Sequence, residues 1–387
     1  MYRIGEEEIQ AVRRVIESRK LFKINDGGQE CMHFEEELKA KFGTKHALLM
    51  TAGKAALMSG LIGMGIGPGD EVIVPAYTYI ATAIAVTAVG AVPVIAEVDD
   101  SLTLCPEDFE RKISPHTKAV IPVHIMGFPS DMTKIMEISK KYGIMVLEDA
   151  CQSDGGSYKD KRLGTIGDAG AYSFNYFKII TSGEGGALVT DNRQLYERAL
   201  IYHDSSAIAF FGNQLEGIAE PQFCGVQFRS NEITGAILRE QLKRLDGILF
   251  DLRKNKKYLM DNLSGRYNFI RSNDIEGDCG TTLPFFFDTI DEAVAFQNYA
   301  GEKGYGTTRP IDTGKHVYSN WTPIMEKRGA FHPKFDPFKF EENQGLQTDY
   351  SPDMCKQTLD LLARTVYVGI DPDWSEETLE NIVSNLK

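Results

Sequence analysis

The chain alternates short apolar runs with helical patterns, and this alternation restricts its fold more than any other feature. The apolar runs show no polar alternation, which is typical of strands that are buried on both faces. They stand at residues 46–50, 71–74, 92–96, 118–123, 144–147 and 187–190, and helical patterns separate most of them. This order predicts an α/β fold with a mostly parallel sheet between helices. Ligands of such sheets gather at the carboxyl ends of the strands.

The length of the chain predicts more than one domain. It has 387 residues, which is more than a single hydrophobic core comfortably supports. We predict an amphipathic helix within residues 1–20 that packs on the rest, a large domain at 21–246 and a small α+β domain at 247–387. The stretch 311–349 is aromatic and loop-like, and we expect no regular structure there.

Charge and cysteine pattern exclude several classes of protein. A net charge of −13 argues against nucleic-acid binding and against adhesion to anionic membranes. The N-terminus lacks the pattern of a signal peptide, and no apolar run approaches about 18 residues. The six cysteines are scattered without a C-x-x-C pair, so we expect neither a metal site nor a redox motif. We therefore expect a cytoplasmic protein with reduced thiols.

Two residues indicate a specific chemistry. Asp149 ends the apolar run VLED, and Lys178 follows 29 positions later (178 − 149) inside SFNYFKII. An amine attacks an aldehyde only in its uncharged form, which apolar surroundings favour. A carboxylate at a strand end can hold the protonated nitrogen of a pyridine ring. The alternatives are a surface lysine and an acid that caps the next segment. The apolar neighbours of the lysine are Phe174, Tyr176, Phe177, Ile179 and Ile180.

A candidate phosphate turn follows the first strand. In TAGKAAL, Thr51 is a plausible N-cap, and the backbone amides of Gly53, Lys54 and Ala55 begin a helix. Free amides at a helix start attract a phosphate dianion. Ser173, five positions before the lysine, can donate its hydroxyl to the same phosphate. Tyr79 either stacks on a ligand ring or packs in the core.

These segments together resemble one family. TAGKAAL, VPAYTYIAT, GAVPV, VLEDACQ, SFNYFKIITSGEGG and GVQFRSNEITGAILREQLKRLD occur in this order over residues 34–246. In content and order they resemble the DegT/DnrJ/EryC1/StrS aminotransferases. Those enzymes have fold type I, use pyridoxal 5′-phosphate and act mostly on keto-sugars or keto-cyclitols.

The resemblance implies a role for each candidate residue. Lys178 would form the Schiff base with the cofactor and move the proton between Cα and C4′, and Asp149 would hold the ring nitrogen. Gln152 would contact the phenolic oxygen, and Tyr79 would stack on the ring. The phosphate would be held by Ser173, Lys54 and Ala55, with the Gly53 amide.

The resemblance also implies a homodimer with a shared active site. The segment GVQFR would come from the neighbouring subunit and add the Gln227 amide to the phosphate site. The family usually has asparagine there and threonine at the position of Lys54. Gln227 is one methylene longer than asparagine. Lys54 can act as a point charge on the phosphate or can point to solvent.

The implied reaction is a ping-pong transamination with L-glutamate, or L-glutamine in the cyclitol branch, as donor. The acceptor would be a keto-sugar, nucleotide-linked, in amino-sugar, polysaccharide or secondary-metabolite biosynthesis. A free keto-cyclitol or keto-octulosonate remains an alternative acceptor. Related sugar dehydratases keep the fold and replace the lysine by histidine, so Lys178 argues against that activity. A non-catalytic sensor is a third reading, but no basic appendage supports it.

The C-terminal third offers weaker candidates for acceptor binding. Arg309, Lys315 and Arg328 are possible contacts for a diphosphate, or simply solvated charges. The loop 205–222 and three ring residues can shape the acceptor pocket or pack in the ordinary way. These rings belong to His316, Tyr318 and Trp321.

Overall fold

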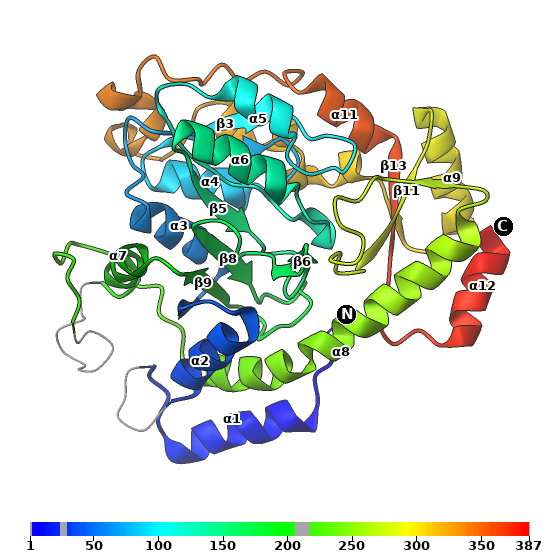
Figure 1. Ribbon diagram of the computed structural model, residues 1–387, viewed down its shortest axis with the longest axis horizontal. Helices are drawn as coiled ribbons and strands as arrows, with labels where there is room; N and C mark the ends of the chain where they lie inside the picture. Colours follow the sequence, from blue (N-terminus) through cyan, green and yellow to red (C-terminus); the bar gives the residue numbers. More distant parts are fainter. Residues whose placement is uncertain (1, 24–28, 206–216, 387) are drawn as a thin grey trace.

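The computed structural model describes residues 2–23, 29–205 and 217–386 (Figure 1). Most of the loop predicted at 205–222 lies outside these residues. Everything below refers to the described part of the chain.

A seven-stranded sheet forms the centre of the larger part of the molecule. Its strand order is β1-β9-β8-β5-β4-β2-β3. Neighbours from β8 to β3 are parallel, and β9 alone runs antiparallel to both of its neighbours. The predicted mostly parallel sheet is therefore confirmed. The strands are β1 (His46–Met50), β2 (Glu71–Pro75), β3 (Val92–Ala96), β4 (Thr117–Val120), β5 (Met145–Asp149), β8 (Ala169–Ser173) and β9 (Gly186–Thr190).

Helices cover both faces of this sheet. One face packs on α3 (Gly53–Gly63), α4 (Ala81–Ala88) and α7 (Arg193–His203). The other face packs on α5 (Pro106–Lys112) and α6 (Met132–Tyr142) at the β3 side. At the β1 side it packs on α2 (Glu30–Phe42) and α8 (Glu232–Leu263). Successive side chains of a strand point to opposite faces of the sheet. In β1, Leu48 therefore packs in the core on one face and Leu49 in the core on the other.

A second, four-stranded sheet lies at the far end of α8 (Figure 1). Its strands are antiparallel, in the order β10 (Asn268–Phe269), β11 (Thr282–Phe286), β13 (Thr365–Gly369) and β12 (Thr307–Thr308). It packs on α9 (Ile290–Glu302), α12 (Glu376–Leu386) and α8 itself. The boundary predicted at 246/247 falls inside α8, which is continuous over 32 residues. Helix α1 (Glu6–Ser18) lies along the other end of α8 (Figure 1).

Several local predictions differ from the structure. The N-cap of α3 is Ala52 and not Thr51, whose backbone N–H instead donates to the Phe228 carbonyl at 3.0 Å. The stretch 311–349 is not structureless. It contains α10 (Thr322–Met325), a short helix α11 (Lys356–Ala363) follows it, and six 3₁₀ turns occur between 310 and 343. Tyr318 and Trp321 are fully buried against the core of the seven-stranded sheet, so they serve packing.

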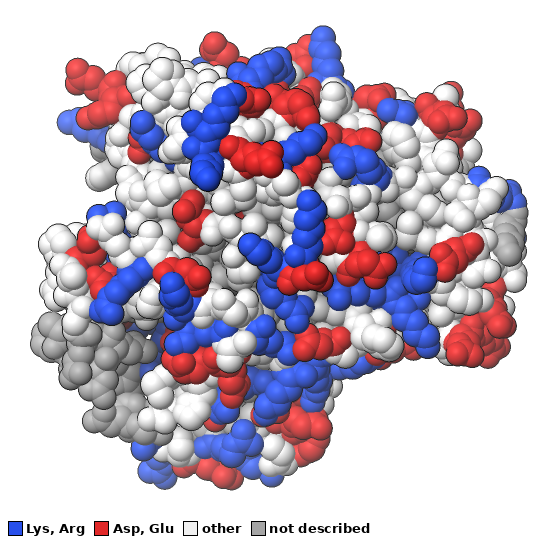
Figure 2. Space-filling model, in the orientation of Figure 1, with Lys and Arg blue, Asp and Glu red and all other residues white. Residues whose placement is uncertain are grey.

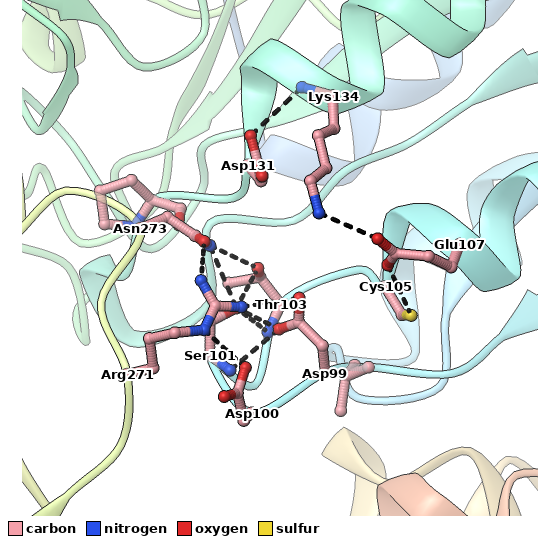
Figure 3. A network of polar contacts seen from close by, with 12 residues as sticks. Asp99, Asp100, Ser101, Thr103, Cys105, Glu107, Asp131, Lys134, Arg271 and Asn273 are labelled. Carbon is pink, nitrogen blue, oxygen red and sulfur yellow. Dashed lines mark hydrogen bonds and ion pairs between the residues drawn. The ribbon is translucent and has the colours of Figure 1, made fainter.

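A polar network ties the two sheets together (Figure 3). Arg271, which follows β10, forms ion pairs with Asp99 at 2.9 Å and Asp100 at 2.6 Å in the loop after β3. Asn273 donates to the Ser101 hydroxyl at 3.1 Å and to the Pro129 carbonyl at 2.9 Å. Burial raises the pKa of Asp99, and the Arg271 charge opposes that rise. The network fixes the segment before β11 against the large sheet.

The surface charge, the hydropathy of the helices and the possible metal ligands bear on the sequence predictions. Acidic and basic side chains alternate over much of the face shown in Figure 2. None of the helices in the described residues is both long and apolar enough to cross a bilayer. Across residues 2–23, 29–205 and 217–386, no cluster of His, Cys, Asp and Glu is arranged to hold a metal ion.

Candidate active site

Two adjoining cavities lie at the carboxyl ends of the parallel strands. The larger, of about 450 Å³, opens between the two sheets. The smaller, of about 220 Å³, reaches the start of α3. Both are lined by Tyr79, Gln152, Asn175 and Lys178. The structure thus brings together residues that lie up to 99 positions apart (178 − 79).

Asp149 occupies a fixed position at the end of β5. Its side chain lines the smaller cavity and is 5% exposed. One carboxylate oxygen accepts a hydrogen bond from the Thr82 hydroxyl at 2.8 Å, and the other accepts one from the Cys151 backbone N–H at 3.1 Å. The carboxylate therefore cannot rotate freely, and it presents a preset acceptor to a ligand.

Gln152 is oriented by an irregular backbone segment. Its Oε1 accepts a hydrogen bond from the Met126 backbone N–H at 3.1 Å. Met126 has a left-handed backbone conformation, with φ of 52°, and its carbonyl accepts a bond from the Thr281 hydroxyl at 2.7 Å. Because Oε1 is occupied, the amide NH₂ is the group that remains for a ligand in the cavity.

The start of α3 is a cradle built from backbone. A Cβ on Gly53 would lie 2.7 Å from the Cys151 sulfur and 2.8 Å from the Ser173 Cβ. A Cβ on Gly186 would lie 2.5 Å from the Gly53 nitrogen. Only glycine allows this approach, and the first intrahelical bond comes from Ala56 to the Ala52 carbonyl, at 3.2 Å. The preceding helical N–H groups are therefore free to bind an anion.

Side chains add to this cradle. The Ser173 side chain, at the end of β8, and the exposed Lys54 side chain both line the smaller cavity. Ala55 is buried, and its side chain is not part of the cavity wall, so only its backbone N–H is available. Glu184 also lines this cavity, and the sequence did not point to it.

Lys178 lies on the connection between β8 and β9 and is half-buried. Ile179 and Ile180 beside it are buried, as expected. Tyr176 and Phe177, however, are 63% and 78% exposed, so they do not bury the lysine, although Phe177 lines the larger cavity beside it. Hydrogen bonds from this connection to the glycine turn at 183–185 direct the two rings outward.

Two aromatic rings form one wall of the larger cavity. Tyr79 is 49% exposed, and its ring lies 5.3 Å from that of His316, at an angle of 52°. Burial lowers the pKa of His316, and the Lys178 charge lowers it further, so the imidazole is neutral at pH 7. The sequence named His316 only as an aromatic residue of uncertain purpose.

Other wall residues had no signal in the sequence. Thr82, Met126, Asn175 and Thr281 come from four separate segments.

Gln227 does not reach either cavity of its own chain. Its side chain is exposed, and its backbone forms a bridge with Asp204. Its neighbour Arg229 is buried in an ion pair with Asp204. The expectation that this segment serves a neighbouring subunit stays a prediction.

The cations suggested for a diphosphate do not line the cavities either. Arg309 is paired with Asp312 at 2.9 Å, and Arg328 is paired with Glu326 at 2.5 Å. Lys315 donates to the Asn320 carbonyl at 3.1 Å. Each of the three already has a local partner.

Comparison with known proteins gives this geometry a family. The model of the DegT/DnrJ/EryC1/StrS aminotransferase family matches residues 2–283. The chain belongs to this family. It is a pyridoxal-phosphate-dependent aminotransferase with the fold type I architecture.

Comparisons with three individual proteins add detail. The aminotransferase is 32% identical to the spore coat polysaccharide biosynthesis protein SpsC of Bacillus subtilis (strain 168), over 99% of this chain and 94% of that protein. It is 26% identical to the solved 3-amino-5-hydroxybenzoic acid synthase, with a TM-score of 0.80 over 100% of this chain and 97% of that chain. An E. coli GDP-4-keto-6-deoxy-D-mannose-3-dehydratase shares the fold at 20% identity, with a TM-score of 0.82 over 100% and 98% of the two chains.

The residues that line the two cavities have the chemical groups that pyridoxal phosphate requires. The anion cradle at Gly53 and Ser173 matches the phosphate, and the Asp149 carboxylate matches a protonated ring nitrogen. Lys178 borders both cavities, where an amine can meet the aldehyde. The residues present therefore fit the cofactor that the family uses.

Proposed function

We propose that this aminotransferase transfers an amino group from L-glutamate or L-glutamine to a keto-sugar, nucleotide-linked, in polysaccharide or amino-sugar biosynthesis. The observation that carries the proposal is that Lys178 lines the same cavity as the anion cradle and the Asp149 carboxylate. Similarity to a polysaccharide biosynthesis protein over nearly the whole chain supports the substrate class.

Bound pyridoxal phosphate supplies an aldehyde that links to an amine and a ring that accepts electrons. Lys178 would hold the cofactor through that link, and its free amine would move the proton of the substrate Cα. Asp149 would keep the ring nitrogen protonated, and the Thr82 and Cys151 hydrogen bonds hold its oxygens in place. The Gln152 NH₂ group would donate to the phenolic oxygen.

The remaining residues anchor and orient. The amides of Gly53, Lys54 and Ala55 and the Ser173 hydroxyl bind the phosphate, and Lys54 adds a charge at its exposed side. Tyr79 packs on the ring face, and neutral His316 borders the space where the substrate binds. The larger cavity accepts the amino acid and the keto-sugar in turn.

A dehydratase on the same scaffold is the second candidate function. A fold shared at 20% identity does not distinguish the two reactions. The lysine does, because the family resemblance implies that such dehydratases have histidine in its place. Lys178 therefore favours transamination. The acceptor can also lack a nucleotide, as a free keto-cyclitol or keto-octulosonate does. The substrate screen below distinguishes these acceptors from nucleotide-linked sugars.

One experiment tests the central assignment. Protein loaded with pyridoxal phosphate should show a visible absorption band, and glutamate or glutamine should convert it to a band at shorter wavelength. Borohydride reduction followed by peptide mapping should place the cofactor on Lys178, and Lys178→Ala should carry none. A reducible link in that variant would overturn the assignment. A band that neither amino acid changes would overturn transamination. Keto-sugars with and without a nucleotide are then added to the converted protein. The acceptor is the compound that restores the original absorption band.

We also propose a homodimer that shares its active sites. Apolar side chains are exposed along α1 and beside the larger cavity, and Gln227 is exposed on the outer side of its chain. A second copy would cover such a surface. The exposed apolar residues are Ile4, Ile9, Ile16, Tyr176 and Phe177.

Complementation tests this sharing. Lys178→Ala and Gln227→Glu should each be inactive, since the second places a negative charge at the phosphate. Co-refolded in equal amounts, they should recover about a quarter of wild-type activity, because half of the dimers are mixed and one of their two sites is intact. No recovery, with dimers verified by sedimentation, would show that each site belongs to one chain.

A further inference from the structure

One residue that lines both cavities has no role in the proposed function. The side chains common to the two walls are those of Tyr79, Gln152, Asn175 and Lys178. Tyr79, Gln152 and Lys178 are assigned to the ring face, the phenolic oxygen and the aldehyde of the cofactor. Asn175 is half-buried where the two cavities adjoin, and it is left without a ligand.

The orientation of the Asn175 amide is fixed by its own turn. Its Oδ1 accepts a hydrogen bond from the Phe177 backbone N–H at 3.0 Å, and its backbone carbonyl accepts one from the Lys178 backbone N–H at 3.1 Å. Because the amide oxygen is occupied, the NH₂ group is the donor that remains. In the part of the chain that the structure describes, no protein atom accepts a hydrogen bond from this Nδ2. The group is therefore available to a ligand in the cavities.

The larger cavity offers few other donors to an anion. Lys178 is the cationic side chain among the described residues of its wall, and the proposed function uses that amine for the cofactor. The Thr281 hydroxyl donates to a backbone carbonyl at 2.7 Å, so its hydrogen is occupied. The His316 Nδ1 donates to a backbone carbonyl at 3.4 Å, which leaves its Nε2 as an acceptor. Asn175 therefore contributes a side-chain donor that no other group uses.

We propose that Asn175 binds the α-carboxylate of the amino-acid donor through its NH₂ group. This assignment rests on the proposed function. The α-carboxylate is bonded to the same carbon as the amino nitrogen that meets the cofactor aldehyde, so it must lie within the region that the Lys178 amine reaches. Asn175 and Lys178 belong to one turn and line the same two cavities. L-Glutamate and L-glutamine share this carboxylate, so one residue serves either donor.

A neutral donor also suits a reaction with two different substrates. The keto-sugar enters the same cavity after the keto acid has left, and it has hydroxyl groups where the amino acid has a carboxylate. A cation built for the carboxylate would then lose its hydration without gaining an anionic partner. An amide NH₂ group donates to a carboxylate oxygen or to a hydroxyl oxygen. Asn175 can therefore serve both halves of the reaction.

Two substitutions separate ligand binding from a structural role. Asn175→Asp keeps the oxygen that accepts from Phe177 and replaces the NH₂ donor by a negative charge, whereas Asn175→Ala removes both groups. The affinity for L-glutamate should fall about tenfold in Asn175→Ala and at least about a hundredfold in Asn175→Asp. If the side chain only holds the turn, Asn175→Asp should resemble wild type and Asn175→Ala should be the weaker variant. That reversed order would overturn the inference.

The first measurement uses protein loaded with pyridoxal phosphate. The affinity is the glutamate concentration that half-saturates the rate at which the absorption band converts, and the maximal rate should stay within about threefold of wild type. Asn192→Asp is the matched control. Asn192 is exposed and lines neither cavity, and its Oδ1 likewise accepts a backbone N–H two positions later, from Gln194 at 3.0 Å. An equal loss of affinity in Asn192→Asp would overturn the inference.

The second measurement uses a ligand that cannot react. Glutarate has carboxylates but no amine, and calorimetry should give the same order of affinities among wild type, Asn175→Ala and Asn175→Asp. The affinity for pyridoxal phosphate should stay within about twofold of wild type in each variant. A loss of cofactor affinity with unchanged glutarate binding would assign Asn175 to the phosphate and overturn the inference.

The inference and the proposed function can fail separately. If glutamate does not change the band of the wild-type protein, or if borohydride does not attach the cofactor to Lys178, the proposed function fails. The glutarate titration needs no reaction and still decides the role of Asn175. If the band converts with the same glutamate affinity in wild type and both Asn175 variants, the proposed function stands and the inference fails.

Discussion

The two ends of the proposed cofactor site are built by different means. At the proposed phosphate end most groups come from backbone, where Gly53 and Gly186 let α3 approach β9. At the ring end they come from side chains, since Thr82, Asp149 and Gln152 are held by hydrogen bonds between separate segments. A backbone cradle depends on the absence of side chains, whereas the ring end depends on particular functional groups. Substitutions at the ring end should therefore lower turnover, whereas substitutions at the phosphate end should weaken cofactor binding.

The largest effect is expected at the ring end. Asp149→Ala removes the carboxylate opposite the ring nitrogen, and kcat/KM should fall about 10³-fold, as for other preorganised charges in active sites. Steady-state kinetics at saturating cofactor measure this, and Asp312→Ala, an exposed acid away from the cavities, is the control. A loss below tenfold would show that the ring end does not depend on this group.

The phosphate end should respond in binding rather than in turnover. Gly53→Ala forces a Cβ to within 2.7 Å of the Cys151 sulfur. Its affinity for pyridoxal phosphate should fall about a hundredfold, with about 1–3 kcal/mol lost from the free energy of unfolding. Absorbance titration and chemical denaturation measure the two.

Gly247→Ala is the matched control for that prediction. This glycine lies within α8, and nothing is found within 4 Å of an added Cβ. The change should leave cofactor affinity unaltered and stabilise the protein by about 0.5–1 kcal/mol, because alanine favours helix. Equal affinities of the two variants would contradict the role of Gly53.

A smaller effect is expected when only the hydrogen bond that supports the Asp149 carboxylate is removed. Thr82→Val keeps the side-chain shape and removes the 2.8 Å hydrogen bond to the carboxylate. We expect kcat to fall about tenfold, since a hydrogen bond to a charged group contributes about 1.5–3 kcal/mol. Thr87→Val on the same helix removes only a bond to the Ile84 carbonyl and is the control. Similar rates for both variants would show that Asp149 holds its position without Thr82.

The smallest effect concerns a buried histidine outside both cavities. His203 is buried next to the segment that contains Gln227, and burial holds the pKa of its imidazole well below the ordinary 6.5. The unfolded chain therefore binds a proton that the folded chain excludes as pH falls below about 6.5. Stability contributed by this group is complete above that pH and decreases by about 1.4 kcal/mol per pH unit below it.

His203→Phe should remove this dependence. Denaturant unfolding at pH 7.0 and pH 5.5 measures the change, and His33→Gln, at an exposed position, should behave as wild type. An unaltered slope in His203→Phe would show that other groups cause the acid sensitivity.

The sequence showed the backbone cradle more clearly than the contacts that support the ring end. Gly53 stands in a local pattern that indicates a glycine turn before a helix. Thr82, Met126 and Thr281 do not, because their roles depend on which segments the fold brings side by side. The same limit explains Tyr176 and Phe177, whose apolar character suggested burial although the turn directs them to the surface. The resemblance to a family named the functional residues, but it did not indicate how they are supported.

The place of β1 in the sheet has a consequence for how the molecule is made. Its last residue, Met50, pairs with Gly186, which is synthesised 136 positions later (186 − 50). At a translation rate of about 5–20 residues per second, the strand waits for roughly 7–30 seconds without its neighbour. The phosphate cradle just after β1 acquires its shape only when that late strand arrives. Cofactor capture during synthesis is therefore delayed until the large sheet is closed at its edge.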